Sequence, residues 1–352
     1  MRETSLDSTV AFLRRSDTYP EAPGEVVAVE THMSWVFLTG RHAYKLKKPV
    51  RLNGVDLGTA DRRRQNCEEE CRLNRRLAPD VYLGVVALTH EPDGRLSLDG
   101  SGEPVDWLVR MRQLSASDML DAVITGGRTA AEESAIRSAA RHLARFYSDS
   151  RPEPISGPAH CSLLADGVRR DVRDLSSARY GLPVRVVESL AGAELTFLEQ
   201  CYPVFERRIH ADRIVDGHGD LRPEHICLRP APAIIDCLEF AKELRILDPA
   251  DELAFLALEC ERLGDARAGQ WFLETYSHVT GDEPPASLIH FYRVYRALRR
   301  ARIAVAHLDD PRVPNPETFA ERARRYIEMV EPVPVAPSAA VPSQSRVQQF
   351  RE

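Results

Sequence analysis

The sequence predicts an α+β protein in which a strand-rich segment is followed by a mainly helical one. Three observations predict this order: residues 1–112 contain short β-prone runs around one long helical pattern, residues 113–330 show mostly helical periodicity, and residues 331–352 are rich in Pro, Ser and Ala. The last composition buries too little apolar surface to fold, so we expect a disordered tail there. The predicted parts are therefore an N-terminal lobe, a C-terminal lobe and a tail with these boundaries.

The N-terminal lobe is predicted to be a small antiparallel sheet with one helix. Five runs have the alternation or the β-prone content of strands: residues 26–30, 34–39, 43–47, 85–89 and 105–111. A helix is expected to begin after Thr59, a plausible N-cap, and to continue to Leu77, with Pro79 as its stop. The resulting order, three strands, a helix and two strands, is typical of a small antiparallel lobe.

Helical periodicity dominates from residue 113, with one interruption. Amphipathic patterns predict helices around residues 136–147, 195–209, 251–263 and 287–307. Between residues 215 and 240 the pattern changes to two short apolar runs, 226–228 and 233–235, which are joined by a Pro-rich turn. A hairpin among helices is a favourable place for chemistry, because short rigid strands fix the loop side chains beside them.

Composition and charge exclude several classes of protein. The net charge of −6 disfavours a nucleic-acid partner, no apolar run approaches the ~18 residues of a membrane span, and the first residues lack a secretory apolar stretch. The seven cysteines are odd in number and scattered, unlike a disulfide framework. Zinc at Cys67 and Cys71 is conceivable, but helical spacing of small apolar residues explains this pair better. We therefore expect a cytoplasmic protein with reduced cysteines that binds neither nucleic acid nor a membrane.

Two aspartates flank the predicted hairpin. Asp220 lies in the run of residues 216–228, and Asp236 follows the second apolar run. Phosphoryl transfer needs one carboxylate that orients the attacking hydroxyl and another that binds the metal on the triphosphate. The hairpin would bring both acids to one edge. Aspartates beside glycine are also common in turns and caps, so spacing alone leaves both interpretations open.

Residues 218–225, His-Gly-Asp-Leu-Arg-Pro-Glu-His, followed by Ile-Asp at 235–236, resemble the catalytic and metal-binding loops of the aminoglycoside phosphotransferase and protein-kinase-like superfamily. Further stretches resemble its bacterial aminoglycoside phosphotransferase-like group: residues 30–40, 44–50, 68–79 and 82–86. The resemblance extends to about residue 330. It implies a two-lobed kinase-like fold, ATP or GTP with Mg²⁺ or alternatively Mn²⁺, and transfer of the γ-phosphoryl group to a hydroxyl of an unidentified small molecule. Because no Gly-x-x-x-x-Gly-Lys-Ser/Thr motif occurs, the P-loop ATPase domain often fused to this group is expected to be missing.

The resemblance also implies roles for individual residues. Asp220 matches the catalytic base and Asp236 the magnesium ligand of the superfamily. Lys45 matches the lysine that holds the α- and β-phosphates, and Lys47, on the same strand face, is the alternative. Glu70 matches the helix glutamate that pairs with that lysine. A surface lysine in a basic run is the competing interpretation of Lys45, which the order of strand, helix glutamate and loop disfavours.

Several positions depart from the superfamily pattern. His225 replaces an asparagine, and three roles stay open for it: a hydrogen bond to Asp220, which we favour, coordination of manganese or another transition ion, or reduced activity. Arg222 could contact the γ-phosphate or form a surface ion pair. In place of a glycine-rich loop, a turn ending in Ser34 could contact phosphate through hydroxyls and amides.

Two further residues are expected to act through the structure. His218 is predicted to support the loop by hydrogen bonding, and Glu252 stands where the superfamily usually has a fold-stabilising aspartate.

Two alternative functions remain: a pseudokinase-like module that binds nucleotide without transfer, and a kinase that acts on protein side chains. The resemblance does not make an aminoglycoside the acceptor, because fold does not determine substrate.

Overall fold

The computed structural model describes residues 5–52, 55–309, 313 and 315–334. Most of the predicted tail, residues 335–352, lies outside the described residues. The chain forms two compact units: the first comprises Met1–Pro154 and Asp212–Pro284, and the second Ile155–Ala211 and Pro285–Glu352. The predicted lobe boundary near residue 112 stays a prediction, and each unit is described below by itself.

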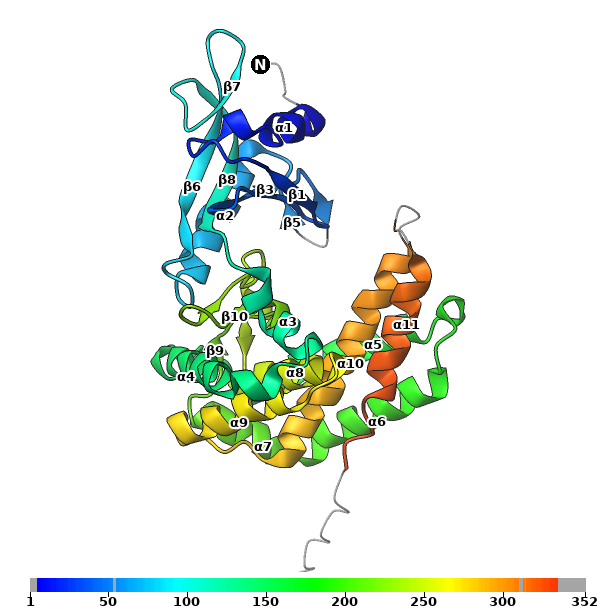
Figure 1. The fold of residues 1–352 in the computed structure, drawn as a ribbon. Coiled ribbons are helices and arrows are strands. Elements are labelled where there is room, and N and C mark those ends of the chain that lie inside the picture. The colour runs from blue at the N-terminus through cyan, green and yellow to red at the C-terminus, as the bar shows by residue number, and fades with distance from the viewer. Residues whose placement is uncertain (1–4, 53–54, 310–312, 314, 335–352) are drawn as a thin grey trace, which may run out of the picture. The chain divides into compact units, whose positions relative to one another are not determined.

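The first unit contains a six-stranded antiparallel sheet (Figure 1). Its strands, in the order in which they lie side by side, are β1 (Val27–Glu30), β2 (Ser34–Leu38), β3 (His42–Lys47), β8 (Glu103–Arg112), β6 (Tyr82–His90) and β7 (Leu96–Leu98). The five predicted strands are all present. The sequence did not predict β7, because a strand of three residues is too short to show alternation. A separate two-stranded pair consists of β4 (Arg51–Leu52) and β5 (Val55–Asp56).

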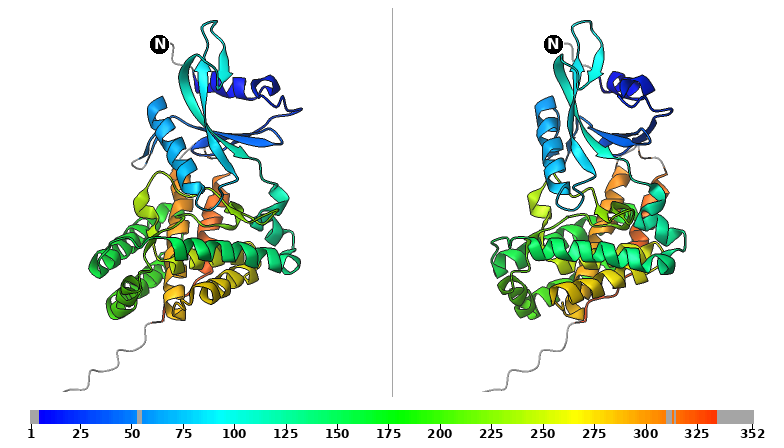
Figure 2. Two further views of the ribbon diagram at one scale, coloured as in Figure 1. Left: turned by 90° about the vertical axis from the view of Figure 1, so that its left-hand side faces the viewer. Right: turned by 60° about the vertical axis from the view of Figure 1, so that its left-hand side comes forward.

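Helix α2 (Ala60–Asn74) packs on one face of this sheet, against β6 and β8 (Figure 2). The Thr59 hydroxyl accepts a hydrogen bond from the Arg62 amide at 3.3 Å, which confirms the predicted N-cap. The predicted end at Leu77 is wrong, because the helix ends at Asn74. The Asn74 side-chain amide donates to the carbonyl of Glu70 in the last turn, where it competes with the helical bonds.

The two faces of β3 pack against different helices. Helix α1 (Leu6–Leu13), which the sequence did not predict, packs its Leu13 with Tyr44 and Leu46 in a core on one face. Alternation turns the intervening side chains of β3 to the other face, where Ala43 packs with the cysteines of α2. Lys45 and Lys47 therefore both face α2.

The rest of the first unit is helical around two short strand pairs. Its helices are α3 (Leu120–Thr125), α4 (Glu133–Asp149), α8 (Pro249–Arg262) and α9 (Arg267–Thr280). The predicted hairpin is confirmed as β10 (Ile226–Cys227) and β11 (Ala233–Ile234), and β9 (Val215–Asp216) pairs with β12 (Ile246–Leu247). Leu221, Ile226 and Ile234 are buried in the same core as α4 and α8, so the loops beside the hairpin rest on a rigid base.

The second unit consists of five α-helices in the part of the chain that is described. They are α5 (Gly157–Leu175), α6 (Val184–Gln200), α7 (Tyr202–His210), α10 (Ala286–Ala306) and α11 (Pro316–Glu328). The single helix predicted around residues 195–209 is wrong: α6 and α7 are separated at Cys201. Pro203 explains the break, because it cannot donate within a helix interior but fits the first turn of a new one.

All seven cysteines are free in the structure, and five of them are buried. In the described residues, no helix is both long enough and apolar enough to span a membrane.

Candidate active site

Lys45 joins three parts of the first unit. Its Nζ lies 2.8 Å from Oε1 of Glu70 on α2 and 2.6 Å from Oδ1 of Asp236 in the loop after β11. The structure therefore brings together the lysine, the helix glutamate and the second aspartate that the sequence singled out. The side chain of Glu70 is fully buried, whereas that of Asp236 remains 43% exposed. Asp236 is therefore the most exposed member of this cluster.

Lys47 contacts the same glutamate from the next position on that strand face. Its Nζ contacts Oε2 of Glu70 and lies 2.5 Å from Oε1 of Glu239. The Lys47 side chain is only 2% exposed. Ser34 stands opposite Lys47 in the β2–β3 register, is likewise buried, and its hydroxyl makes no hydrogen bond within the described chain. The phosphate contacts predicted for Ser34 and Lys47 stay predictions, but both side chains are shielded from solvent.

The close lysines keep the carboxylates of this cluster ionised. Burial acts to raise the pKa of Glu70, but the charges of Lys45 and Lys47 outweigh it, so the pKa lies below its usual value. Burial acts to raise the pKa of Asp236 as well, but the charge of Lys45 outweighs it, so this pKa is also lowered. Burial acts to lower the pKa of Lys45, yet Asp236 and Glu70 raise it well above the ordinary value.

Asp236 has an unusual backbone conformation. Its φ of +64° lies in the left-handed region, which aspartate tolerates better than most residues. The Tyr82 hydroxyl accepts a hydrogen bond from the Asp236 amide at 3.2 Å. Such conformations persist where the surroundings hold them, and they concentrate at functional sites.

Asp220 lies in the loop between β9 and β10, with its carboxylate about one quarter exposed. Its Oδ2 accepts a hydrogen bond from Nε of Arg222 at 3.0 Å. The same guanidinium donates to Oε1 of Glu224 at 2.6 Å and to Nε2 of His225 at 3.1 Å. Arg222 is thus held at three points within its own loop, in a partly buried setting and not as a fully exposed ion pair.

The hydrogen bonds of His225 define its tautomer. Nδ1 lies 2.9 Å from the main-chain carbonyl of Asp220, and a carbonyl can only accept, so we assign the proton to Nδ1. Nε2 then accepts from Arg222 and lies 3.5 Å from Oδ2 of Asp236. The favoured bond to Asp220 is present, but it goes to the backbone and not to the carboxylate, and the Nε2 lone pair is directed to the neighbourhood of Asp236.

Buried side chains fix the backbone of the Asp220 loop. The Glu252 carboxylate accepts from the amide of His218 at 3.0 Å, contacts the amide of Gly219, and accepts from the Tyr147 hydroxyl at 2.7 Å. His218 donates through Nε2 to the carbonyl of Ile235 at 2.8 Å, which confirms the predicted support by hydrogen bonding. Burial, with a contribution from His225, lowers the pKa of His218 to about 4, so His218 is neutral near pH 7.

Solved structures with the same architecture identify the fold. A choline/ethanolamine kinase family protein from Mesorhizobium loti matches with a TM-score of 0.53 and 14% identity, over 91% of this chain and 93% of that one. The GDP complex of aminoglycoside 2'-phosphotransferase-IIIa matches with a TM-score of 0.51 and 15% identity, over 92% and 98%. The chain has the protein-kinase-like fold. This result confirms the fold class and the resemblance inferred from the sequence.

Sequence comparison finds related proteins whose activity is itself uncharacterized. No family model matches the chain. An uncharacterized protein of Mycobacterium tuberculosis, and one of Mycobacterium bovis, are 36% identical to it over 321 residues, which cover 88% of this chain and 60% of each relative. The chain thus spans about three fifths of the length of these relatives.

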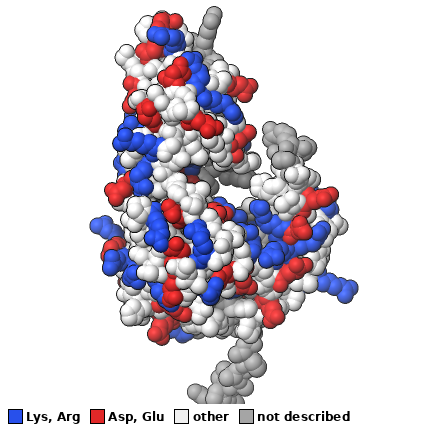
Figure 3. Space-filling view, viewed as in Figure 1, with Lys and Arg blue, Asp and Glu red and all other residues white. Residues whose placement is uncertain are grey.

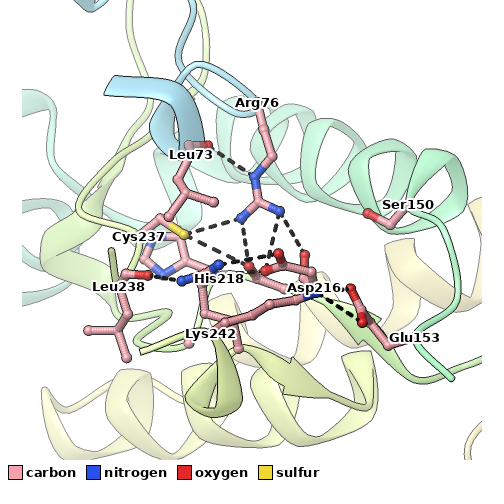
Figure 4. Close-up of polar contacts among 12 residues, drawn as sticks. Leu73, Arg76, Ser150, Glu153, Asp216, His218, Cys237, Leu238 and Lys242 are labelled. Atoms are coloured by element: carbon pink, nitrogen blue, oxygen red, sulfur yellow. Dashed lines mark hydrogen bonds and ion pairs between the residues drawn. The ribbon is translucent and has the colours of Figure 1, made fainter. Parts of the chain in front are cut away.

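Within the kinase-like fold, the sequence analysis did not identify two residues that hold the loops of the site. Arg76, just beyond the end of α2, donates to the carbonyls of Asp216 and Gly217 at 2.9 and 2.8 Å and lies 3.3 Å from Sγ of Cys237 (Figure 4). The Asn74 amide oxygen accepts from the Cys237 amide at 2.9 Å. Both residues look in sequence like ordinary polar residues at a helix end. Only their contacts show that they tie α2 to the loops that carry Asp220 and Asp236.

Proposed function

We propose that this chain is a kinase-like phosphotransferase that transfers the γ-phosphoryl group of ATP or GTP to a hydroxyl of a small molecule. The contact of Lys45 with both Glu70 and Asp236 carries this proposal. It joins a strand, a helix and a loop at the place where phosphoryl transfer needs a cation for the phosphates and a carboxylate for the metal. Structures with this fold include complexes with GDP and with AMP-PNP, which supports nucleotide binding.

In this proposal Asp236 holds the metal ion, and His225 joins it only when its Nε2 gives up the hydrogen bond from Arg222. Among the described residues, no cluster of three or more His, Cys, Asp or Glu forms a complete protein site, so the ligand would supply the remaining donors. The donors present are an ionised carboxylate oxygen and an imidazole nitrogen, 3.5 Å apart. Mg²⁺ prefers oxygen, whereas Mn²⁺ also accepts imidazole, so this pair fits Mn²⁺ at least as well as Mg²⁺. The ion would neutralise charge on the phosphates.

Asp220 is the base in this proposal. It would orient the acceptor hydroxyl and take its proton, with the Arg222 guanidinium holding its carboxylate in place. The remaining donors of Arg222 would contact the γ-phosphate. Lys45 would hold the other phosphates, with Glu70 behind it.

The acceptor is a hydroxyl compound whose identity the site does not define. Solved neighbours contain kanamycin or hygromycin B, but at 10–15% identity they share only the fold with this chain. A pseudokinase-like module is the second candidate function. The observation that favours it is His225, which occupies the position of a metal-binding asparagine and is itself bonded to Arg222.

Turnover and binding measurements test the proposal. ATP and GTP turnover would be measured with Mg²⁺ and with Mn²⁺ in the presence of a library of hydroxyl compounds, for the unaltered protein, Asp220→Asn and His225→Asn. We expect Asp220→Asn to lose about 10²-fold or more of the transfer rate, as for removal of a base. Asp149→Asn, at the exposed end of α4, is the matched control.

Each outcome has a distinct meaning. Labelled phosphate on a small compound supports the proposal and names the acceptor, whereas label on protein favours a protein kinase. Nucleotide binding without transfer under either metal favours the pseudokinase. Failure to bind any nucleotide would show that the assignment of Lys45, Glu70 and Asp236 is wrong.

A further inference from the structure

The phosphotransferase proposal leaves Lys47 without a function. Lys47 is a charged side chain that is almost completely buried, which is costly unless its charge is compensated. Its Nζ is committed to Glu70 and Glu239, and Ser34 stands opposite it on β2. A lysine in this position is poorly placed to reach a phosphate, so its charge must act on its neighbours.

The contacts form an alternating row of five charges across the first unit. In order, the members are Asp236, Lys45, Glu70, Lys47 and Glu239. Each oxygen of Glu70 is committed to a different lysine: Oε1 to Lys45 and Oε2 to Lys47. The two ends of the row, Asp236 and Glu239, lie in the same loop three residues apart. The row therefore ties β3, α2 and this loop together before any ligand binds.

The two lysines differ in what they can do when nucleotide binds. Lys45 has one contact with the partly exposed Asp236, so phosphates can attract it away from that carboxylate. Without Lys47, Glu70 would then keep one oxygen buried and uncompensated, which destabilises an ionised group. With Lys47 in place, Glu70 keeps a buried cation that the ligand does not reach, and its own carboxylate stays where Lys45 needs it.

We propose that Lys47 and Glu239 form a positioning pair that fixes Glu70, and through it Lys45, for nucleotide binding. This inference rests on the proposed function, because it assigns Lys45 to the phosphates. Lys47 touches neither phosphate nor acceptor in this scheme. Glu239 balances the charge of Lys47, because its Oε1 lies 2.5 Å from the Lys47 Nζ. This second contact holds Lys47 against Glu70.

Five single variants and the double variant of Lys47 and Glu239 test the pair; one of the five, Lys45→Met, reports on the proposed phosphate contact itself. Lys47→Met and Glu239→Gln keep the size of each side chain and remove its charge. Lys242→Met and Glu243→Gln are matched controls, because both residues are exposed and follow Glu239 in the same segment. The dissociation constant of a non-hydrolysable ATP analogue, and kcat and KM for nucleotide, would be measured on the folded protein well below its melting temperature.

We expect Lys47→Met and Glu239→Gln each to weaken nucleotide binding and raise KM by about tenfold, with a smaller change in kcat, while the controls stay within about twofold. The double variant should be no worse than Lys47→Met alone, since residues that act as a unit are not additive. Hydrogen exchange of α2 in the ligand-free variants should be faster than in the unaltered protein, because the helix has lost an anchor.

Three results would overturn the inference. A folded Lys47→Met protein that binds the analogue as tightly as the unaltered protein would show that the lysine only fills space. Additive effects in the double variant would show that Lys47 and Glu239 act separately. If the unaltered protein binds no nucleotide, the proposed function fails and this inference with it; if Lys45→Met loses binding but Lys47→Met does not, only this inference fails.

Discussion

Each of the two units contains a buried carboxylate between two cations, and the two sites behave differently. In the first unit, Glu70 lies between Lys45 and Lys47. In the second, Asp171 lies 2.6 Å from Nε of Arg302 and 3.6 Å from Nε of Arg299. The pKa of Glu70 is lowered, whereas burial raises the pKa of Asp171 despite the two arginines.

The difference follows from the number of close contacts and from the exposure of the cations. Both lysines contact Glu70 closely, and Lys47 is almost fully buried. The two arginines of the second unit remain partly exposed, and Nε of Arg299 lies 3.6 Å from the carboxylate, so water screens much of their attraction for Asp171. Similar charges thus keep the buried Glu70 ionised in one unit and leave an incompletely compensated acid in the other.

The second unit also contains a cavity, and its lining does not resemble the row of charges around Glu70. Its volume is about 380 Å³, and Arg302 forms part of its lining. The other two arginines in the lining already pair with acids: Arg173 lies 3.7 Å from Asp174, and Arg179 lies 2.9 Å from Asp309. Figure 3 shows the same intermixing of basic and acidic side chains on this face of the second unit. The charges there neutralise one another and are not gathered for one ligand.

The largest difference between the two carboxylates is expected in kcat/KM when each is replaced by its amide. Glu70→Gln should reduce kcat/KM by about a hundredfold, because Lys45, which we propose binds the phosphates, loses its fixed partner. Asp171→Asn, the matched amide substitution in the second unit, should leave the rate within about twofold. Steady-state phosphoryl-transfer assays on both variants check this prediction. Equal losses of kcat/KM would show that Glu70 has no special role in transfer.

The next largest difference between the two carboxylates is expected in the free energy of unfolding of their amide variants. Glu70→Gln leaves Lys47 buried with only Glu239 as its partner, so we expect a loss of about 3 kcal/mol in the free energy of unfolding. Asp171→Asn removes a carboxylate whose burial its arginines do not fully offset, and its arginines can reach water, so the loss should be about 1 kcal/mol or less. Urea unfolding of both variants measures the difference, and a larger loss for Asp171→Asn would reverse our interpretation.

The dependence of stability on pH should have opposite signs at the two sites. The folded-state pKa of Glu70 is lowered, so its contribution to stability is full above the unfolded value near 4.5 and is lost as pH falls. The folded-state pKa of Asp171 is raised, so stability falls as pH rises from 3.8 through the folded pKa. Melting curves between about pH 2 and 7, each compared with the corresponding amide variant, should show the Glu70 slope below about pH 4.5 and the opposite Asp171 slope above about pH 3.8.

Thiol reactivity is the smallest expected contrast. In the first unit, burial raises the pKa of Cys71 to about 11 and that of Cys237 to about 12. In the second unit, burial also raises the pKa of Cys161 to about 11, but Cys161 and Cys201 are only partly buried. Iodoacetamide at pH 8 should therefore modify these two slowly and the buried thiols of the first unit hardly at all. Peptide mass spectrometry of native protein checks the order.

Much of the site could be predicted because its signals are local. Lys45 lies on a strand with clear alternation, Glu70 on a helix with a recognisable N-cap, and Asp220 and Asp236 beside a hairpin bounded by short apolar runs. The kinase-like fold and the pairing of Lys45 with Glu70 followed from these patterns together with the resemblance, whereas the contact of Lys45 with Asp236 was not predicted. The end of α2 and the break between α6 and α7 did not, because a side-chain hydrogen bond and a proline override smooth periodicity there.

By itself, the sequence determined the fold class, five strands and the long helix of the first lobe, and the short list of residues from which a phosphotransferase site could be made. The tertiary structure alone decided which partners those residues have. Lys47 meets Glu239 across 192 positions of chain, Arg76 reaches the loops of Asp216 and Cys237, and Glu252 holds the amides behind Asp220. The physical reason is that periodicity and capping are encoded within a few residues, whereas the partner of a buried charge depends on which distant segments pack together.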